Sequence, residues 1–106
     1  MGSERRRAPR YPFIAEAEIT EIDSVTKLRA RTSDLSLSGC FLDMMNPSPL
    51  GTKIQISISH ENTTFTVFGR VAFVCPNMGM GVAFTKLEHD QLPVLHRWVS
   101  KLSGSE

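Results

Sequence analysis

Apolar and polar residues alternate along most of this chain, which is the pattern of β-strands that bury one face. The alternation covers residues 13–20 and 53–59, where, except at Ile14, apolar positions are separated by glutamate, serine, threonine, lysine or glutamine. The same period covers residues 28–32 and 78–84, and a short apolar run covers 40–42. Between these stretches lie turn-forming residues, so the sequence predicts short strands joined by tight connections.

A further predicted strand is longer and contains a glycine, Gly69. Its period-two pattern places four apolar residues on one buried face: Phe65, Val67, Val71 and Phe73. Glycine inside a strand favours a bend or a bulge, which we expect at Gly69. About six antiparallel strands with turns between them are typical of a small, mainly β barrel.

The end of the chain changes period. Apolar residues recur at intervals of three and four, which indicates an amphipathic helix over about 90–102. Asp90 is the expected N-cap, and Pro93 then falls in the first turn, where its missing N–H costs little. Trp98 is expected to pack the helix against the barrel. The predicted fold is all-β in the main, a six-stranded antiparallel barrel with a C-terminal α-helix.

Length and charge refine this picture. The chain has 106 residues, enough for one domain and one core. The net charge is +1, but Arg5, Arg6, Arg7 and Arg10 are four of the twelve basic residues. We therefore divide the chain into a flexible basic arm, 1–10, and a barrel domain, 11–103.

Targeting and redox signals are few. No apolar run reaches the length of a membrane span, no signal peptide is visible, and we expect a cytoplasmic protein. Cys40 and Cys75 lie in apolar, strand-like sequence, which favours two buried reduced thiols over a disulfide.

The candidate chemistry lies in the stretch Asp34-Leu35-Ser36-Leu37-Ser38-Gly39. Asp34 and Ser36 are two residues apart, so in extended backbone their side chains share a face. Gly39 allows a turn with positive φ or a close approach of a ligand to the backbone. In isolation, such a stretch is most simply a turn between strands. At the amino end, Arg6 and Arg10 have the spacing RxxxR, and the DxSxxG stretch begins 24 residues after Arg10.

Together these two motifs resemble those of the PilZ domain, a bacterial receptor module for cyclic di-GMP. The resemblance extends from about Glu4 to Leu102 and includes Gly81-Val82-Ala83-Phe84, which is similar to the last strand of the family. It implies a six-stranded barrel with a carboxyl-terminal helix. It also implies that Arg6, Arg10, Asp34, Ser36 and Gly39 bind cyclic di-GMP. The residue before RxxxR, here Arg5, resembles the type that binds two ligand molecules per chain.

Arginine suits such a ligand, because its planar guanidinium forms paired hydrogen bonds with phosphate or guanine and stacks on bases. A carboxylate such as Asp34 accepts from N1–H and N2–H₂ of guanine and so selects guanine over adenine. Arg29 and Arg31 precede Asp34 and are read as a solvated strand face, with the ligand surface as the alternative. We expect ligand binding to order the arm and to create a surface for an unidentified downstream protein.

Two other function classes remain open. One is a PilZ-like protein-interaction module without a ligand, against which the intact motifs argue. The other is a barrel that binds single-stranded nucleic acid, which requires exposed aromatic residues, whereas Phe65, Phe73 and Phe84 fall on core-facing positions. We expect neither DNA nor RNA as partner.

An enzyme is not expected, nor a metal or cofactor. No histidine lies near Asp34 and Ser36 in the sequence, and His89 and His96 lack a third metal ligand.

Overall fold

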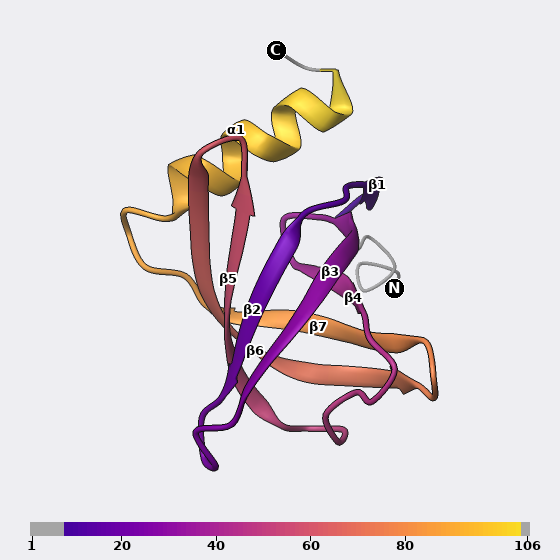
Figure 1. Ribbon diagram of the computed structural model, residues 1–106. Helices are drawn as coiled ribbons and strands as arrows, with labels where there is room; N and C mark the ends of the chain where they lie inside the picture. The colour runs from indigo at the N-terminus through magenta and orange to yellow at the C-terminus, as the bar shows by residue number, and fades with distance from the viewer. Residues whose placement is uncertain (1–7, 105–106) are drawn as a thin grey trace, which may run out of the picture.

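The computed structural model describes residues 8–104, which form seven strands and one helix (Figure 1). In chain order these elements are β1 (Tyr11–Pro12), β2 (Glu16–Glu21), β3 (Lys27–Leu35), β4 (Gly39–Asp43), β5 (Lys53–His60), β6 (Thr63–Cys75), β7 (Gly79–Lys86) and α1 (Leu92–Ser103).

The strands form one antiparallel sheet with the order β1-β3-β2-β5-β6-β7-β4. A further pairing of β3 with β4 joins the two sides of the sheet and closes strands β2 to β7 into a barrel. The prediction of a six-stranded antiparallel barrel with a C-terminal helix is confirmed. Sequence analysis did not predict β1, whose two residues pair with the end of β3.

The core follows from the alternation in the strands. Ile54, Ile56 and Ile58 of β5 are fully buried, as are Phe65 and Val71 of β6. Their polar neighbours face outward, which is the arrangement expected of a sheet with one wet face. Burial of each such side chain stabilises the folded state by about 1.5–3 kcal/mol, so these alternating positions supply the main stabilisation of the barrel.

Helix α1 lies across one end of the barrel, near the β5–β6 hairpin and β1 (Figure 1). Leu95 and Trp98 are its buried residues, which confirms the packing role predicted for Trp98. The prediction of Asp90 as N-cap is wrong, because the N-cap is Gln91. The Gln91 side chain does not cap the helix. Its Oε1 accepts a hydrogen bond from the backbone N–H of Thr66 at 2.8 Å and so fixes the start of α1 to β6.

The pairing of β6 with β7 is interrupted twice. The first register shift, between Phe68 and Gly69, confirms the irregularity predicted at Gly69. The second lies between the pairs Val71–Val82 and Phe73–Gly81, where β6 has one additional residue, Ala72. Such a bulge reverses the alternation beyond it. The prediction that Phe73 faces the core is therefore wrong, and Phe73 is 43% exposed.

Two other residues are more exposed than the sequence suggested. Met78 precedes β7 and is 67% exposed, so it does not line the last strand. Both cysteines are free thiols, but only Cys40 is buried, and Cys75 at the end of β6 is partly exposed.

Candidate functional site

The two sequence motifs meet at an ion pair between Arg10 and Asp34. The Nη1 atom of Arg10 lies 3.0 Å from Oδ1 of Asp34, and the two side chains are 39% and 26% exposed. Strand β1 explains the contact, because it follows Arg10 directly and pairs Pro12 with Asp34. The backbone N–H of Phe41 donates a second hydrogen bond to the same carboxylate oxygen at 2.9 Å. One member of RxxxR and the first residue of DxSxxG thus form one cluster.

Arg5 and Arg6 lie outside the described residues, so their places in this cluster stay predictions. The same holds for the arm from residue 1 to residue 7.

Asp34 faces outward because of a bulge in β3. The register shifts between the pairs Thr32–Leu42 and Asp34–Phe41, which leaves Ser33 as the additional residue on β3. Thr32 and Leu35 are both fully buried, so the carboxylate between them points to the opposite side of the sheet. Unbroken alternation from Thr32 would have turned Asp34 into the core.

Ser36 does not extend the strand, which ends at Leu35. Its Oγ accepts hydrogen bonds from the backbone N–H groups of Ser38 and Gly39, each at 3.1 Å, and is 3.2 Å from the carbonyl oxygen of Gly39. The side chain is 1% exposed. The expectation that Asp34 and Ser36 share the face of an extended strand is therefore wrong, since Ser36 organises the turn between β3 and β4. Its contact with a ligand stays a prediction.

Gly39 is required by packing between strands. Its φ is not in the left-handed region, and a Cβ atom at this position would lie 2.1 Å from the carbonyl oxygen of Val82 in β7. Glycine therefore permits the close approach of β4 to β7. That the Gly39 backbone also approaches a ligand stays a prediction.

A row of paired residues continues from Asp34 across the outer face of the sheet. Asp34 pairs with Phe41 of β4, Phe41 with Gly81 of β7, and Gly81 with Phe73 of β6. Because directly paired residues share a face, these side chains lie on the same outer surface. Gly81 has no side chain, and the rings of Phe41 and Phe73 contact each other with centroids 6.0 Å apart and planes inclined by 31°.

Sequence analysis missed both phenylalanines as site residues. The signal that was present is the pair of glycines at 79 and 81, because glycine in a strand marks a close approach to neighbouring groups. A Cβ atom at Gly81 would lie 2.1 Å from Cε1 of Phe73.

A comparison with protein families matches the family model described as the PilZ domain to residues 4–101. The chain belongs to the PilZ domain family. A search of curated proteins gave no match.

Solved PilZ structures have the same fold. The PilZ domain of CeSA from a cellulose-synthesising bacterium is 21% identical, with a TM-score of 0.73 over 91% of this chain and 99% of that chain. The PilZ domain of YcgR from Escherichia coli, solved with c-di-GMP, is 18% identical, with a TM-score of 0.76 over 94% and 92%. The Bacillus subtilis inhibitor of motility, MotI/DgrA, is 14% identical, with a TM-score of 0.73 over 96% of this chain and 53% of that chain.

In this PilZ domain, the other arginines of β3 lie on a solvated strand face, as expected. Arg29 is 3.7 Å from Glu18, with side chains that are 82% and 71% exposed. Arg31 pairs with Asp43 in the strand register and is exposed. The exposed ion pair of Arg29 with Glu18 contributes little to stability.

The inner side of the site is apolar. Burial raises the pKa of the Cys40 thiol from 9.0 to about 12; the Asp34 carboxylate acts in the same direction, and the Arg10 guanidinium opposes both. Cys40 is therefore a neutral packing residue behind the charged cluster.

Within residues 8–104, no group of three or more histidine, cysteine or acidic side chains is arranged to hold a metal ion. His89 and His96 are both exposed. In the same part of the chain, α1 has twelve residues, and no helix is long and apolar enough to cross a membrane.

Proposed function

We propose that this PilZ domain is a non-enzymatic receptor for cyclic di-GMP, acting without a metal or cofactor. The observation that carries the proposal is the contact between Arg10 and Asp34, which joins RxxxR to DxSxxG in the folded chain. The PilZ domain of YcgR, solved with c-di-GMP, has the same fold and supports the choice of ligand. In this proposal the ligand-binding residues are Arg5, Arg6, Arg10, Asp34, Ser36 and Gly39.

The Asp34 carboxylate is suited to guanine. Within the described residues, both of its hydrogen bonds use Oδ1, one from Arg10 and one from Phe41. Oδ2 is then available to accept from N1–H or N2–H₂ of a guanine. The adenine edge presents an unprotonated N1 at the corresponding position, so the same carboxylate discriminates against adenine.

Arg10 has two roles in the proposed complex. Its guanidinium has five N–H donors, and the ion pair with Asp34 uses one of them, from Nη1. The remaining donors can bind a phosphate while the ion pair keeps the side chain in place. Arg6 and Arg5 supply further positive charge, and Arg5 favours two ligand molecules per chain.

The proposed signal is the ordering of the arm across the face that bears Asp34. Arg10 already contacts Asp34, so the proposed change concerns the residues before it. Fixing each residue costs about 1–2 kcal/mol of backbone entropy, which the contacts to phosphate and guanine must offset. The ordered arm would present a new surface to a downstream protein. Hydrogen exchange of residues 4–10 should slow on addition of ligand, while β5 changes little.

Calorimetric titration with cyclic di-GMP, cyclic di-AMP and GTP tests the proposal. Arg6→Ala, Arg10→Ala and Asp34→Asn should each weaken binding of cyclic di-GMP at least about tenfold, the usual effect of losing a charge-assisted hydrogen bond. Arg29→Ala is the matched control, because Arg29 also lies on β3 and forms an exposed ion pair with Glu18 instead of a contact with Asp34. The parent should bind two ligands and Arg5→Leu closer to one. Absence of heat from the parent at micromolar cyclic di-GMP would show the proposal to be wrong.

A second candidate function is binding of single-stranded nucleic acid. It gains support from the exposure of Phe73, because an exposed aromatic ring on a β-barrel is a stacking platform for bases. Fluorescence anisotropy with labelled single-stranded RNA and DNA, over a range of salt concentrations, tests it. Tight binding of an oligonucleotide together with no binding of cyclic di-GMP would favour this second function.

A further inference from the structure

Phe73 occupies an unusual position for a large apolar side chain. The bulge at Ala72 turns it out of the barrel, and 43% of its surface remains exposed. The ring does not extend into solvent but lies over Gly81, since a Cβ atom there would be within 2.7 Å of three of its ring atoms. The backbone of β7 at Gly81 therefore covers one side of the Phe73 ring, and the rest of the ring remains accessible.

Phe41 lies between Phe73 and Asp34 on the same outer face of the sheet. A Cβ atom at Gly79 would lie 2.8 Å from Cε2 of Phe41, so a second glycine makes room for the second ring. The two rings are inclined by 31°, which is a tilted rather than an edge-to-face pair, and each ring is partly accessible to solvent. On the other side, Phe41 is the direct cross-strand partner of Asp34 and donates its backbone N–H to that carboxylate.

Bulges set both ends of the row. Ser33 turns Asp34 outward on β3, and Ala72 turns Phe73 outward on β6. Bulges are common beside functional sites, where they redirect a side chain. Two independent bulges that bring a carboxylate and an aromatic ring onto one row point to a ligand that needs both.

We propose that Phe41 and Phe73 form an aromatic platform on which the guanine bases of cyclic di-GMP stack. This inference rests on the proposed receptor function and adds a subsite that neither RxxxR nor DxSxxG contains. A guanine presents hydrogen-bond donors at its edge and a π-face above and below, so a carboxylate beside an aromatic surface matches both features.

The length of the row favours a ligand with two bases. Neighbouring strands are about 4.8 Å apart, and the Phe73 ring lies over Gly81 of β7, two strands from Asp34, so the row from Asp34 to this ring spans roughly 10 Å. A single purine is shorter than this distance. One base can therefore place its edge at Asp34 and its face near Phe41, while the second base reaches Phe73.

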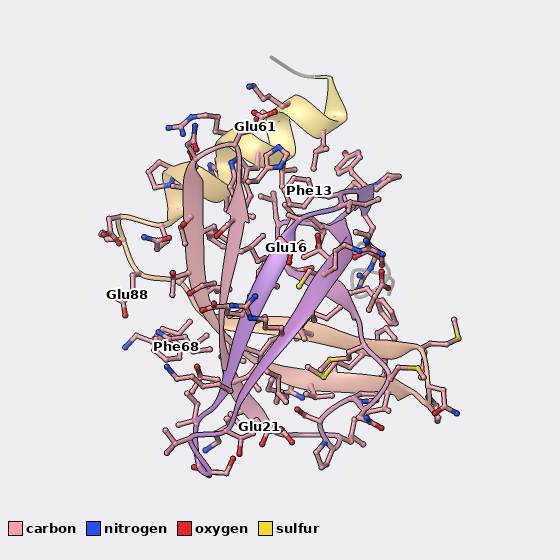
Figure 2. The ribbon with its side chains drawn as sticks, viewed as in Figure 1. Phe13, Glu16, Glu21, Glu61, Phe68 and Glu88 are labelled. Carbon is pink, nitrogen blue, oxygen red and sulfur yellow. The ribbon has the colours of Figure 1, made fainter. Side chains whose placement is uncertain are left out.

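The first experiment compares two phenylalanines of the same strand. Phe73→Leu should weaken binding of cyclic di-GMP about tenfold, because a stacked base loses its aromatic partner. Phe68→Leu is the matched control, since Phe68 is also partly exposed on β6 but pairs with Gln55 and lies away from β3 and β4 (Figure 2). Its affinity should equal that of the parent. Thermal melts of both variants establish that each is folded.

The second experiment uses Phe73→Trp, which keeps an aromatic platform and adds a fluorophore. The chain has one tryptophan, Trp98, which lies on the buried face of α1. Cyclic di-GMP should quench the emission of the new tryptophan, because a stacked guanine lies in direct contact with the indole. Affinity should be equal to or greater than that of the parent. This variant also decides the question if Phe73→Leu does not fold.

The outcomes separate the platform from the receptor. Binding by the parent with unchanged affinity in Phe73→Leu, or with no quenching in Phe73→Trp, overturns the platform and leaves the receptor function in place. The ring of Phe73 would then serve only to cover Gly81. Absence of binding by the parent overturns the receptor function and the platform with it. Weakening in Phe73→Leu together with quenching in Phe73→Trp supports both.

Discussion

Two groups of aromatic residues in this molecule have similar contacts and opposite environments. Between α1 and the barrel, the ring centroid of Trp98 lies 5.3 Å from that of Phe13 and 5.9 Å from that of Phe65, and all three side chains are buried. On the outer face of the sheet, Phe41 and Phe73 are 6.0 Å apart, and both are accessible to solvent. Figure 2 labels Phe13 beside the helix, at the end of the barrel that α1 covers.

The difference between the groups lies in what each one joins. The buried group connects the segment before β2, the long strand β6 and the helix, which are far apart in the sequence. The exposed pair connects strands that backbone hydrogen bonds already hold together. Rings that join distant elements stabilise the fold, whereas rings on an already paired, exposed surface are available for binding. The distinction predicts large stability effects for the first group and small ones for the second.

The largest effect is expected for Trp98→Ala. Loss of this side chain leaves a cavity beneath α1 and should lower the free energy of unfolding by about 3–5 kcal/mol. Urea denaturation followed by circular dichroism measures the change. Phe73→Ala is the control on the outer face and should cost less than about 1.5 kcal/mol, because much of its ring is already in water. Equal losses in the two variants would contradict the distinction.

The next effect compares two glycines. Gly39→Ala should lower the free energy of unfolding by about 2–3 kcal/mol, because the new methyl group meets the fixed carbonyl oxygen of Val82. Gly81→Ala should cost about 1 kcal/mol, because its methyl group meets the partly exposed ring of Phe73, which can move.

Adding Phe73→Ala to Gly81→Ala should recover most of that loss, since the clash is removed. The double variant therefore tests whether the ring lies over Gly81. Additive losses in the double variant would show that it does not.

The barrel and the location of the site were predictable from the sequence for physical reasons. Period-two alternation in β2 and β5 reflects one solvent-exposed and one buried face of each strand. The DxSxxG motif covers the end of β3 and the turn that follows it. The bulges were not predictable in the same way. Serine and alanine are not residue types that mark a bulge. The additional residue, Ser33 or Ala72, becomes visible only when the strand is aligned with its paired neighbour.

Three predictions failed because the pattern along one strand or helix does not reveal local geometry. Alternation through Ala72 assigned Phe73 to the core, and alternation through Leu35 placed Ser36 beside Asp34. The N-cap was placed one residue early, at Asp90, because Gln91 has a tertiary contact that outweighs capping preference. The ion pair of Arg10 with Asp34 gives the spacing of the two motifs a structural basis through the pairing of β1 with β3.

A third test compares the buried cysteine, Cys40, with the partly exposed one, Cys75. The pKa of Cys40 is raised from 9.0 to about 12 in the folded protein, so folding favours the protonated thiol. Its contribution to stability is fully present below pH 9.0 and is lost as the pH rises toward 12. Through that range the parent should lose up to about 1.4 kcal/mol per pH unit more than Cys40→Ala.

Thiol labelling gives an independent check of the same comparison. Cys75 is partly exposed and should react with a maleimide before Cys40 does. Cys75→Ser should then show only slow labelling in the folded state and rapid labelling in denaturant. Rapid labelling of Cys75→Ser under native conditions would show that Cys40 is accessible.

The smallest effect is expected in the β2–β3 connection, away from both aromatic groups. Val25 has a φ of 59°, in the left-handed region that β-branched residues avoid. Val25→Asn should raise the free energy of unfolding by about 1 kcal/mol, because asparagine tolerates this conformation. Binding of cyclic di-GMP should be unchanged, which makes this variant a reference for stability changes without consequence at the site. A loss of stability would show that the Val25 side chain has a packing role.

The bulges at Ser33 and Ala72 each shift the alternation of inward and outward side chains by one residue. Before each one, even or odd numbering defines the inner face; after it, the opposite parity does. A side chain can therefore move between core and surface by insertion or deletion of one neighbour, without any substitution of its own. Relatives that differ by one residue at these two places would share the same motif letters and present different atoms to a ligand.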